Sequence, residues 1–153
     1  MEYRLRKKGD DTFRLIDPME VVDTSSWGRT YDGTVNVCRE SVYTFLRHVV
    51  RAVKSMYKEA GLWNPQDPPY LHIGGDETPS YTWQMSPLCD QLYRSNPELN
   101  SREDLFPYFI KRYAKIVDEE GFRVIAWEEA FIRDHFPVDP EELELTHSAR
   151  VRK

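Results

Sequence analysis

A helix-like segment followed by a short apolar run occurs twice in this chain, and this repetition limits its possible folds more than any other feature. Apolar residues recur at spacings of three and four over residues 42–57, and again over residues 105–117. A glycine follows each stripe and predicts where the helix ends. The apolar runs at residues 70–73 and 122–127 are typical of buried strands. Helix, strand, helix, strand predicts an α/β fold with a parallel sheet.

Acidic residues follow the first predicted strand. Residues 72–77 read His-Ile-Gly-Gly-Asp-Glu, so that Asp76 and Glu77 come directly after a glycine pair. Two glycines let the backbone turn sharply and leave room for a ligand. Because ligands meet the carboxyl ends of the strands in parallel α/β folds, we expect Asp76, Glu77 and Trp127 to open onto one face.

The predicted organisation has three zones. Residues 1–37 are polar and rich in turn residues, and predict a loop with one short strand near residues 13–16. Residues 38–132 hold the two helix–strand units. Between them, residues 78–100 contain three prolines and predict a long loop, which in a compact domain is more often functional than not. Residues 133–153 are charged and irregular, and we predict no structure for them.

The composition fits one globular domain and narrows the choice of partners. The 153 residues are 40% hydrophobic and 13% aromatic, which is enough for a core. The 26 acidic and 21 basic residues are spread along the chain, without the basic patch that nucleic acid or an anionic membrane would need. No apolar stretch approaches the roughly 18 residues of a membrane span, and the first residues lack the apolar core of a signal peptide. We therefore expect a soluble chain with a small neutral or cationic partner, and neither nucleic acid nor membrane.

The segment around Asp76 and Glu77 resembles the signature of the β-N-acetylhexosaminidases, family 20 of the glycoside hydrolases. The resemblance runs nearly continuously from about Phe13 to Phe131, with flanks similar to the chitobiase-like branch. It implies that the chain is part of a (β/α)8 TIM barrel and holds about two of its eight units. The supporting segments are residues 13–18, 35–38, 59–61, 86–89 and 124–129, together with Ser41, Tyr43, Phe45 and Trp83.

The resemblance also implies roles for individual residues. Family members are retaining enzymes in which the 2-acetamido oxygen of the sugar attacks the anomeric carbon, so the protein supplies no nucleophile and needs no cofactor. Glu77 would be the general acid and base, a role that requires a raised pKa. Asp76 would orient the acetamido group and stabilise the positive charge that develops on it. Trp127 would wall the pocket of a terminal N-acetylhexosamine carried by an oligosaccharide or glycoconjugate.

Each of these residues has an alternative structural role. Adjacent acids at a strand end are usually solvated loop residues. His72 could support the carboxylates or contact substrate, although a histidine within a strand is more often a hydrogen-bonded core residue. Trp127 could belong to the core. Trp83, in the segment after the acids, could line a sugar subsite or anchor the loop. A metal site built from His72, Asp76 and Glu77 is disfavoured because all three would have to converge from one short segment.

The two cysteines, Cys38 and Cys89, can form one disulfide or remain two thiols, and their number alone does not decide. The family resemblance implies a Cys38–Cys89 bridge that restrains the loop carrying Trp83. It also suggests a secreted, periplasmic or lysosomal setting. Nothing in the sequence indicates the oligomeric state.

Length is the main departure from the family, because a complete barrel takes about 250 residues. We therefore expect the isolated chain to be catalytically incompetent. One rival is a non-catalytic fragment that binds N-acetylhexosamine or another partner. A second is the diguanylate cyclases, whose signature also contains Gly-Gly-Asp-Glu on a turn between antiparallel strands. Here Thr78-Pro79 follows, and the proline discourages a returning strand.

Overall fold

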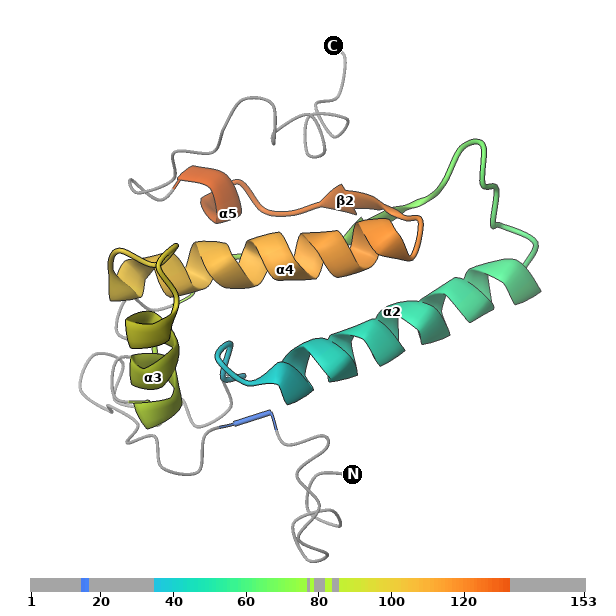
Figure 1. Cartoon of the computed structure of the whole chain (residues 1–153). Coiled ribbons are helices and arrows are strands. Elements are labelled where there is room, and N and C mark those ends of the chain that lie inside the picture. The colour runs from blue at the N-terminus through green and yellow to red at the C-terminus, as the bar shows by residue number, and fades with distance from the viewer. Residues whose placement is uncertain (1–14, 17–34, 77, 79–81, 84–85, 133–153) are drawn as a thin grey trace, which may run out of the picture. The chain divides into compact units, whose positions relative to one another are not determined.

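The computed structural model describes two compact units within the chain (Figure 1). Each unit is made of two stretches of sequence and is treated separately below. The first unit comprises Met1–Phe45 and Thr78–Phe106, and the second comprises Leu46–Glu77 and Pro107–Lys153. The described residues are 15–16, 35–76, 78, 82–83 and 86–132.

Helix α2 spans Glu40–Glu59 and confirms the first predicted helix. Its ends suit the helix dipole, since Glu40 lies in the first turn and Lys58 in the last. The helix stops where Gly61 adopts a φ of +70°, a backbone conformation that glycine enters without a steric penalty. The Leu62 N–H then donates to the carbonyl of Tyr57 at 2.9 Å, which completes the C-terminal cap.

The second unit contains the predicted parallel strand pair. Strand β1 spans Tyr70–His72 and strand β2 spans Arg123–Ile125. They pair in parallel with Leu71 opposite Val124, as predicted from the sequence pattern. The buried apolar residues of this unit are Val50, Ile73, Ile110, Ile116, Val117, Phe122, Val124 and Ala130.

Helix α4 spans Leu105–Glu119 and precedes β2, as the second helical stripe predicts. It follows the short 3-10 helix η1, which spans Arg102–Asp104. The Asp104 carboxylate accepts hydrogen bonds from the backbone N–H groups of Asn100 and Ser101 at 2.6 and 2.8 Å. Asp104 thus forms a capping box with Ser101 at the start of η1. After β2 comes the short helix α5, which spans Glu129–Ile132.

The predicted loop over residues 78–100 is wrong in part, because helix α3 spans Pro87–Ser95. Ser86 caps this helix by accepting a hydrogen bond from the Cys89 N–H at 3.3 Å. Pro87 occupies the first helical turn, where the missing N–H costs nothing and the fixed φ favours the helix. A proline that indicated a loop is thus the residue that opens a helix.

Other predictions fall wholly or partly outside the described residues. Of the short strand predicted near residues 13–16, only Leu15 and Ile16 are described, and neither is in a strand. The Leu15 carbonyl instead accepts a hydrogen bond from the Asn36 N–H at 2.6 Å. The irregular tail predicted for residues 133–153 lies outside the described residues. None of the described helices is long and apolar enough to cross a bilayer.

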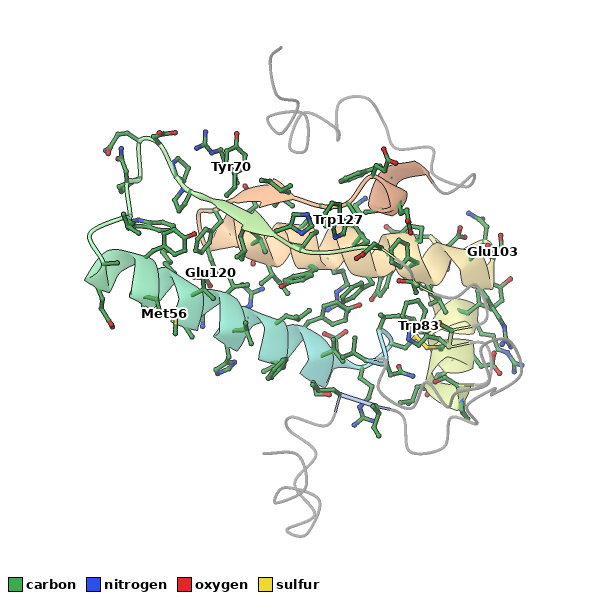
Figure 2. The ribbon with its side chains drawn as sticks, turned by 180° about the vertical axis from the view of Figure 1, so that it is seen from behind. Met56, Tyr70, Trp83, Glu103, Glu120 and Trp127 are labelled. Carbon is green, nitrogen blue, oxygen red and sulfur yellow. A yellow bond between two sulfur atoms is a disulfide. The ribbon has the colours of Figure 1, made fainter. Side chains whose placement is uncertain are left out.

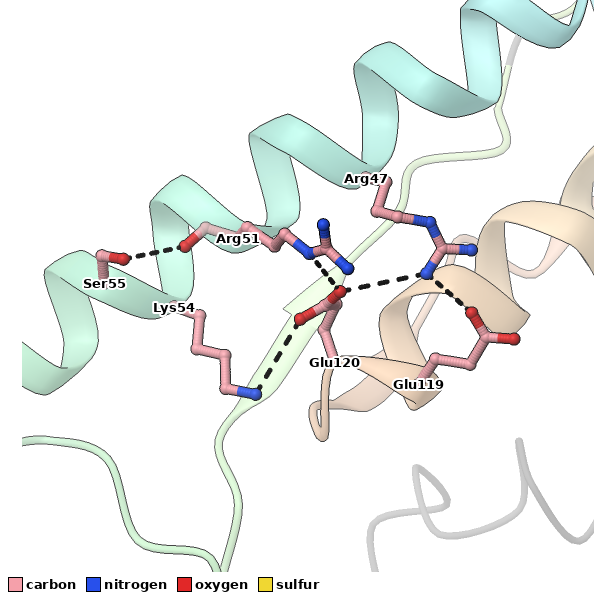
Figure 3. Close-up of polar contacts among 6 residues, drawn as sticks. All are labelled: Arg47, Arg51, Lys54, Ser55, Glu119 and Glu120. Atoms are coloured by element: carbon pink, nitrogen blue, oxygen red, sulfur yellow. Dashed lines mark hydrogen bonds and ion pairs between the residues drawn. The ribbon is translucent and has the colours of Figure 1, made fainter.

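A cluster of charged residues joins α2 to the end of α4 within the second unit (Figure 3). Arg51 Nε donates to the Glu120 carboxylate at 2.6 Å. Arg47 and Lys54 each lie 3.9 Å from the same carboxylate, and Arg47 also donates to Glu119 at 2.7 Å. The Glu120 side chain is only 13% exposed, so these cations replace much of the water that it has lost.

Candidate active site

The glycine pair forms the turn that leaves β1. Gly74 has a φ of +74° and Gly75 a φ of +99°, both in the region that side chains disfavour. A Cβ atom on Gly75 would also lie 2.8 Å from the Cβ of Ala130. Both conformation and space therefore require glycine here, and the turn presents Asp76 to solvent as an exposed residue.

Trp127 reaches this turn from the end of β2 (Figure 2). Its backbone N–H donates to the Gly74 carbonyl at 2.9 Å, and one step earlier the Ile73 N–H donates to Ile125 at 2.8 Å. Hydrogen bonding between the two segments thus continues beyond the three paired residues of each strand. The Trp127 side chain is 54% exposed, so a wide aromatic surface remains available next to the turn.

His72 connects the turn to the tryptophan. Its Nδ1 accepts a hydrogen bond from the Gly74 N–H at 3.0 Å. Its ring packs edge-on against the Trp127 ring, with centroids 4.9 Å apart and planes inclined at 63°. His72 is exposed, which speaks against the core role that its place in a strand suggests.

Of the acid pair, Asp76 is described and Glu77 lies outside the described residues. The structure brings His72, the Gly74–Gly75 turn and Trp127 together at the carboxyl ends of β1 and β2. Asp76 follows that turn directly along the chain. This end of a parallel sheet is where barrel enzymes place their catalytic residues.

Trp83 belongs to the first unit and is only 5% exposed. Its indole N–H donates to the Val35 carbonyl at 2.8 Å. Its φ of +67° is rare for a residue with a bulky side chain. These contacts favour a structural anchor over a sugar contact, and the sugar-binding role of Trp83 stays a prediction.

The first unit also holds the two cysteines and a buried polar pair that the sequence did not reveal. Cys38 and Cys89 are joined by a disulfide, with Cα atoms 5.2 Å apart. Beside it, the fully buried Asn36 side chain donates from Nδ2 to Ser86 Oγ at 2.9 Å. Ser86 caps α3 as well, so one hydroxyl serves both the helix and the 35–38 segment. A serine just before Pro87 is typical of a helix N-cap, so the capping role of Ser86 could have been predicted. No local rule predicts the burial of Asn36 or its hydrogen bond to Ser86.

No group of three metal-ligating side chains occurs within the part of the chain that the structure describes. The site as described therefore consists of a carboxylate, an imidazole and an indole around a glycine turn. The carboxylate and the imidazole can accept hydrogen bonds, and the indole offers an aromatic face.

Comparison with known proteins finds a family model that matches most of the chain. The catalytic-domain model of glycosyl hydrolase family 20 matches residues 7–146. Beta-hexosaminidase B of Pseudoalteromonas piscicida is 34% identical in an alignment of 134 residues that covers 83% of this chain and 16% of that protein. A beta-hexosaminidase of Vibrio vulnificus is 32% identical in an alignment of 152 residues that covers 94% of this chain and 17% of that protein.

Solved structures of family 20 enzymes resemble this chain in fold. The family 20 exo-beta-N-acetylglucosaminidase of Vibrio harveyi, solved with N-acetylglucosamine, superposes with a TM-score of 0.64 at 24% identity. The match covers 78% of this chain and 17% of that one, so the chain spans about a sixth of the length of the relatives it matches. The predicted fold class, part of a (β/α)8 barrel, is confirmed. The chain belongs to glycosyl hydrolase family 20 and carries part of its catalytic domain.

Proposed function

We propose that this chain supplies the acid pair and one aromatic wall of a β-N-acetylhexosaminidase site. The reaction is hydrolysis of terminal non-reducing N-acetyl-β-D-hexosamine residues from oligosaccharides or glycoconjugates. One observation carries the proposal: Trp127 is bonded to the same glycine turn that presents Asp76. An aromatic face and an oriented carboxylate are the two groups that an N-acetylated sugar needs for its C–H surface and its amide N–H.

The proposed mechanism is retaining and assisted by the substrate. Glu77 donates a proton to the glycosidic oxygen as the bond to the anomeric carbon breaks, while the acetamido oxygen forms a bond to that carbon. Asp76 accepts a hydrogen bond from the acetamido N–H and stabilises the cationic ring that results. Glu77 then removes a proton from water, which attacks the anomeric carbon and restores the acetamido group. Trp127 packs against the sugar throughout.

The relatives support the reaction class. Those named above are beta-hexosaminidases, and the Vibrio harveyi structure contains N-acetylglucosamine. We extend that chemistry to this chain because its family match spans the turn, the acids and Trp127. A second candidate, a fragment that binds N-acetylhexosamine without turnover, is favoured by the 54% exposure of the Trp127 side chain.

A chimeric enzyme tests the catalytic roles. Residues 35–132 of this chain would replace the corresponding segment of the Vibrio harveyi enzyme, onto which 78% of the chain superposes. We expect the chimera to release the chromophore from para-nitrophenyl N-acetyl-β-glucosaminide. In it, Glu77→Gln should lower kcat on chitobiose by roughly 10²–10⁴-fold, the usual contribution of a general acid. Asp76→Asn should cost about 10²–10³-fold through loss of electrostatic stabilisation.

The leaving group provides an internal control. Para-nitrophenolate departs without protonation, so Glu77→Gln should slow the aryl substrate less than chitobiose if Glu77 is the acid. Asp118→Asn, at an exposed position on α4, should leave both rates unchanged. A chimera that stays fully active with Glu77→Gln would refute the assignment. Binding of N-acetylglucosamine without hydrolysis would favour the second candidate.

A further inference from the structure

His72 makes two contacts, one through Nδ1 and one through its ring. Nδ1 accepts a hydrogen bond from the Gly74 N–H at 3.0 Å, and the imidazole ring lies inclined to the Trp127 indole at a centroid distance of 4.9 Å. Gly74 and Trp127 are bonded to each other as well, through the Trp127 N–H and the Gly74 carbonyl at 2.9 Å. The three residues therefore form a closed set in which each contacts the other two.

The burial of these residues indicates that packing alone does not hold the set together. His72 is exposed and Trp127 is 54% exposed. An exposed indole gains little from the hydrophobic effect and would otherwise sample several rotamers. The hydrogen bond and the ring contact from His72 thus add to the Trp127–Gly74 hydrogen bond in fixing the turn and the indole.

The hydrogen bond also fixes the state of the imidazole. An Nδ1 atom can accept a hydrogen bond from an amide N–H only when it carries no proton itself, so the imidazole in this contact has its proton on Nε2. The contact from Nδ1 to the N–H two residues later has the geometry of an Asx turn, in which an asparagine oxygen takes the same place. Asparagine can therefore replace one of the two contacts without the other.

We propose that His72 is a positioning residue for the site. Through Nδ1 it sets the turn that presents Asp76, and through its ring it sets the angle of the Trp127 indole. The inference rests on the proposed function for its catalytic meaning, but the two contacts can be tested without substrate. His72 touches neither the reacting atoms nor the leaving group in this role.

Two variants separate the contacts. His72→Asn keeps an acceptor for the Gly74 N–H and removes the ring, whereas His72→Phe keeps a ring edge for Trp127 and removes the acceptor. In the 153-residue chain, NMR should show hydrogen exchange at the Gly74 amide near the wild-type rate in His72→Asn and about fivefold faster in His72→Phe. The nuclear Overhauser contacts between the Trp127 indole, assigned with Trp127→Phe, and Gly74 should weaken in His72→Asn and persist in His72→Phe.

In the chimera, the two His72 variants should change different kinetic constants. His72→Phe removes the hydrogen bond to the Gly74 N–H and so disturbs the turn that presents Asp76. It should lower kcat about fivefold with KM little changed, because that turn positions the proposed reacting groups. His72→Asn loosens the aromatic wall and should raise KM by a similar factor with kcat little changed. His48→Asn, at an exposed histidine on α2, is the matched control and should change none of these quantities.

The imidazole nitrogen resonances decide the matter even if a variant folds poorly. In the neutral imidazole they should report a bare Nδ1 and a proton on Nε2; a neutral tautomer with its proton on Nδ1 would overturn the proposal. Equal behaviour of His72→Asn and His72→Phe at Gly74 and Trp127 would overturn it as well. A wild-type chimera that fails to hydrolyse the aryl substrate would instead count against the proposed function, while the NMR results would still decide the role of His72.

Discussion

Gly75 sits where conformation and space both exclude a side chain. Its φ is +99°, and a Cβ would lie 2.8 Å from the Ala130 Cβ. Gly75→Ala should lower the free energy of unfolding by about 2–5 kcal/mol, since a left-handed conformation costs about 1–2 kcal/mol and overpacking adds about 1–3 kcal/mol. Urea denaturation, monitored by circular dichroism, measures this loss of stability.

Gly61→Ala is the matched control for that substitution. Gly61 has a φ of +70°, and no atom lies within 4 Å of the place that its Cβ would take, so it carries the conformational cost without the collision. Gly61→Ala should therefore lower the free energy of unfolding by about 1–2 kcal/mol. Equal losses at Gly61 and Gly75 would show that the contact with Ala130 is unimportant. Adding Ala130→Gly to Gly75→Ala should recover the difference.

Single residues were predictable where a local rule applied. The glycine pair of the signature predicts a sharp turn, and the positive φ values of Gly74 and Gly75 confirm it. The exposure of His72 was not predictable, because a strand of three residues is too short for its pattern to say which side faces solvent. The Asn36–Ser86 hydrogen bond joins positions 50 residues apart, a contact that no local rule contains.

Among the helices and strands, the long helices were the most predictable from the sequence. Helices α2 and α4, of 20 and 15 residues, contain enough turns for their apolar stripes to be clear. Helix α3 has nine residues and opens with a proline, so it was hidden in a segment that composition alone marks as loop. The parallel pairing of β1 with β2 followed from the order of the elements.

The disulfide joins the segment before α2 to α3 and closes a span of 51 residues. Loop-closure entropy for such a span gives about 4 kcal/mol of stabilisation, through restriction of the unfolded chain. Reduction should therefore lower the urea midpoint of the wild type and leave unchanged a variant carrying Cys38→Ser and Cys89→Ser. Thiol titration of denatured, non-reduced protein should find no free thiol, and two free thiols would contradict the bridge.

At the scale of the whole molecule, the chain contains the proposed acid pair but spans about a sixth of the length of its relatives. A barrel needs eight β/α units to close its interior and to surround a sugar, and about two are present here. We therefore predict that the purified 153-residue chain releases no chromophore from para-nitrophenyl N-acetyl-β-glucosaminide above the level of Glu77→Gln. Release that Glu77→Gln abolishes would contradict this prediction.

The sequence predicts the fold class of the whole molecule. It predicts the arrangement of the site only in part. Alternating helices and strands identify a parallel α/β fold, and the signature with its flanks identifies the family. The sequence also placed Asp76 and Trp127 at neighbouring strand ends. The link between them through His72 and Gly74 depends on how far hydrogen bonding continues past the strands, which no periodicity encodes.

The charged cluster between α2 and α4 has a consequence for how the chain tolerates mutation. Three cations share Glu120, so loss of Arg47 or Lys54, each 3.9 Å away, still leaves that carboxylate bonded to Arg51. Loss of Glu120 leaves like charges facing one another without their common partner. The cluster should therefore tolerate loss of Arg47 or Lys54 better than loss of Glu120, whose carboxylate contacts all three cations.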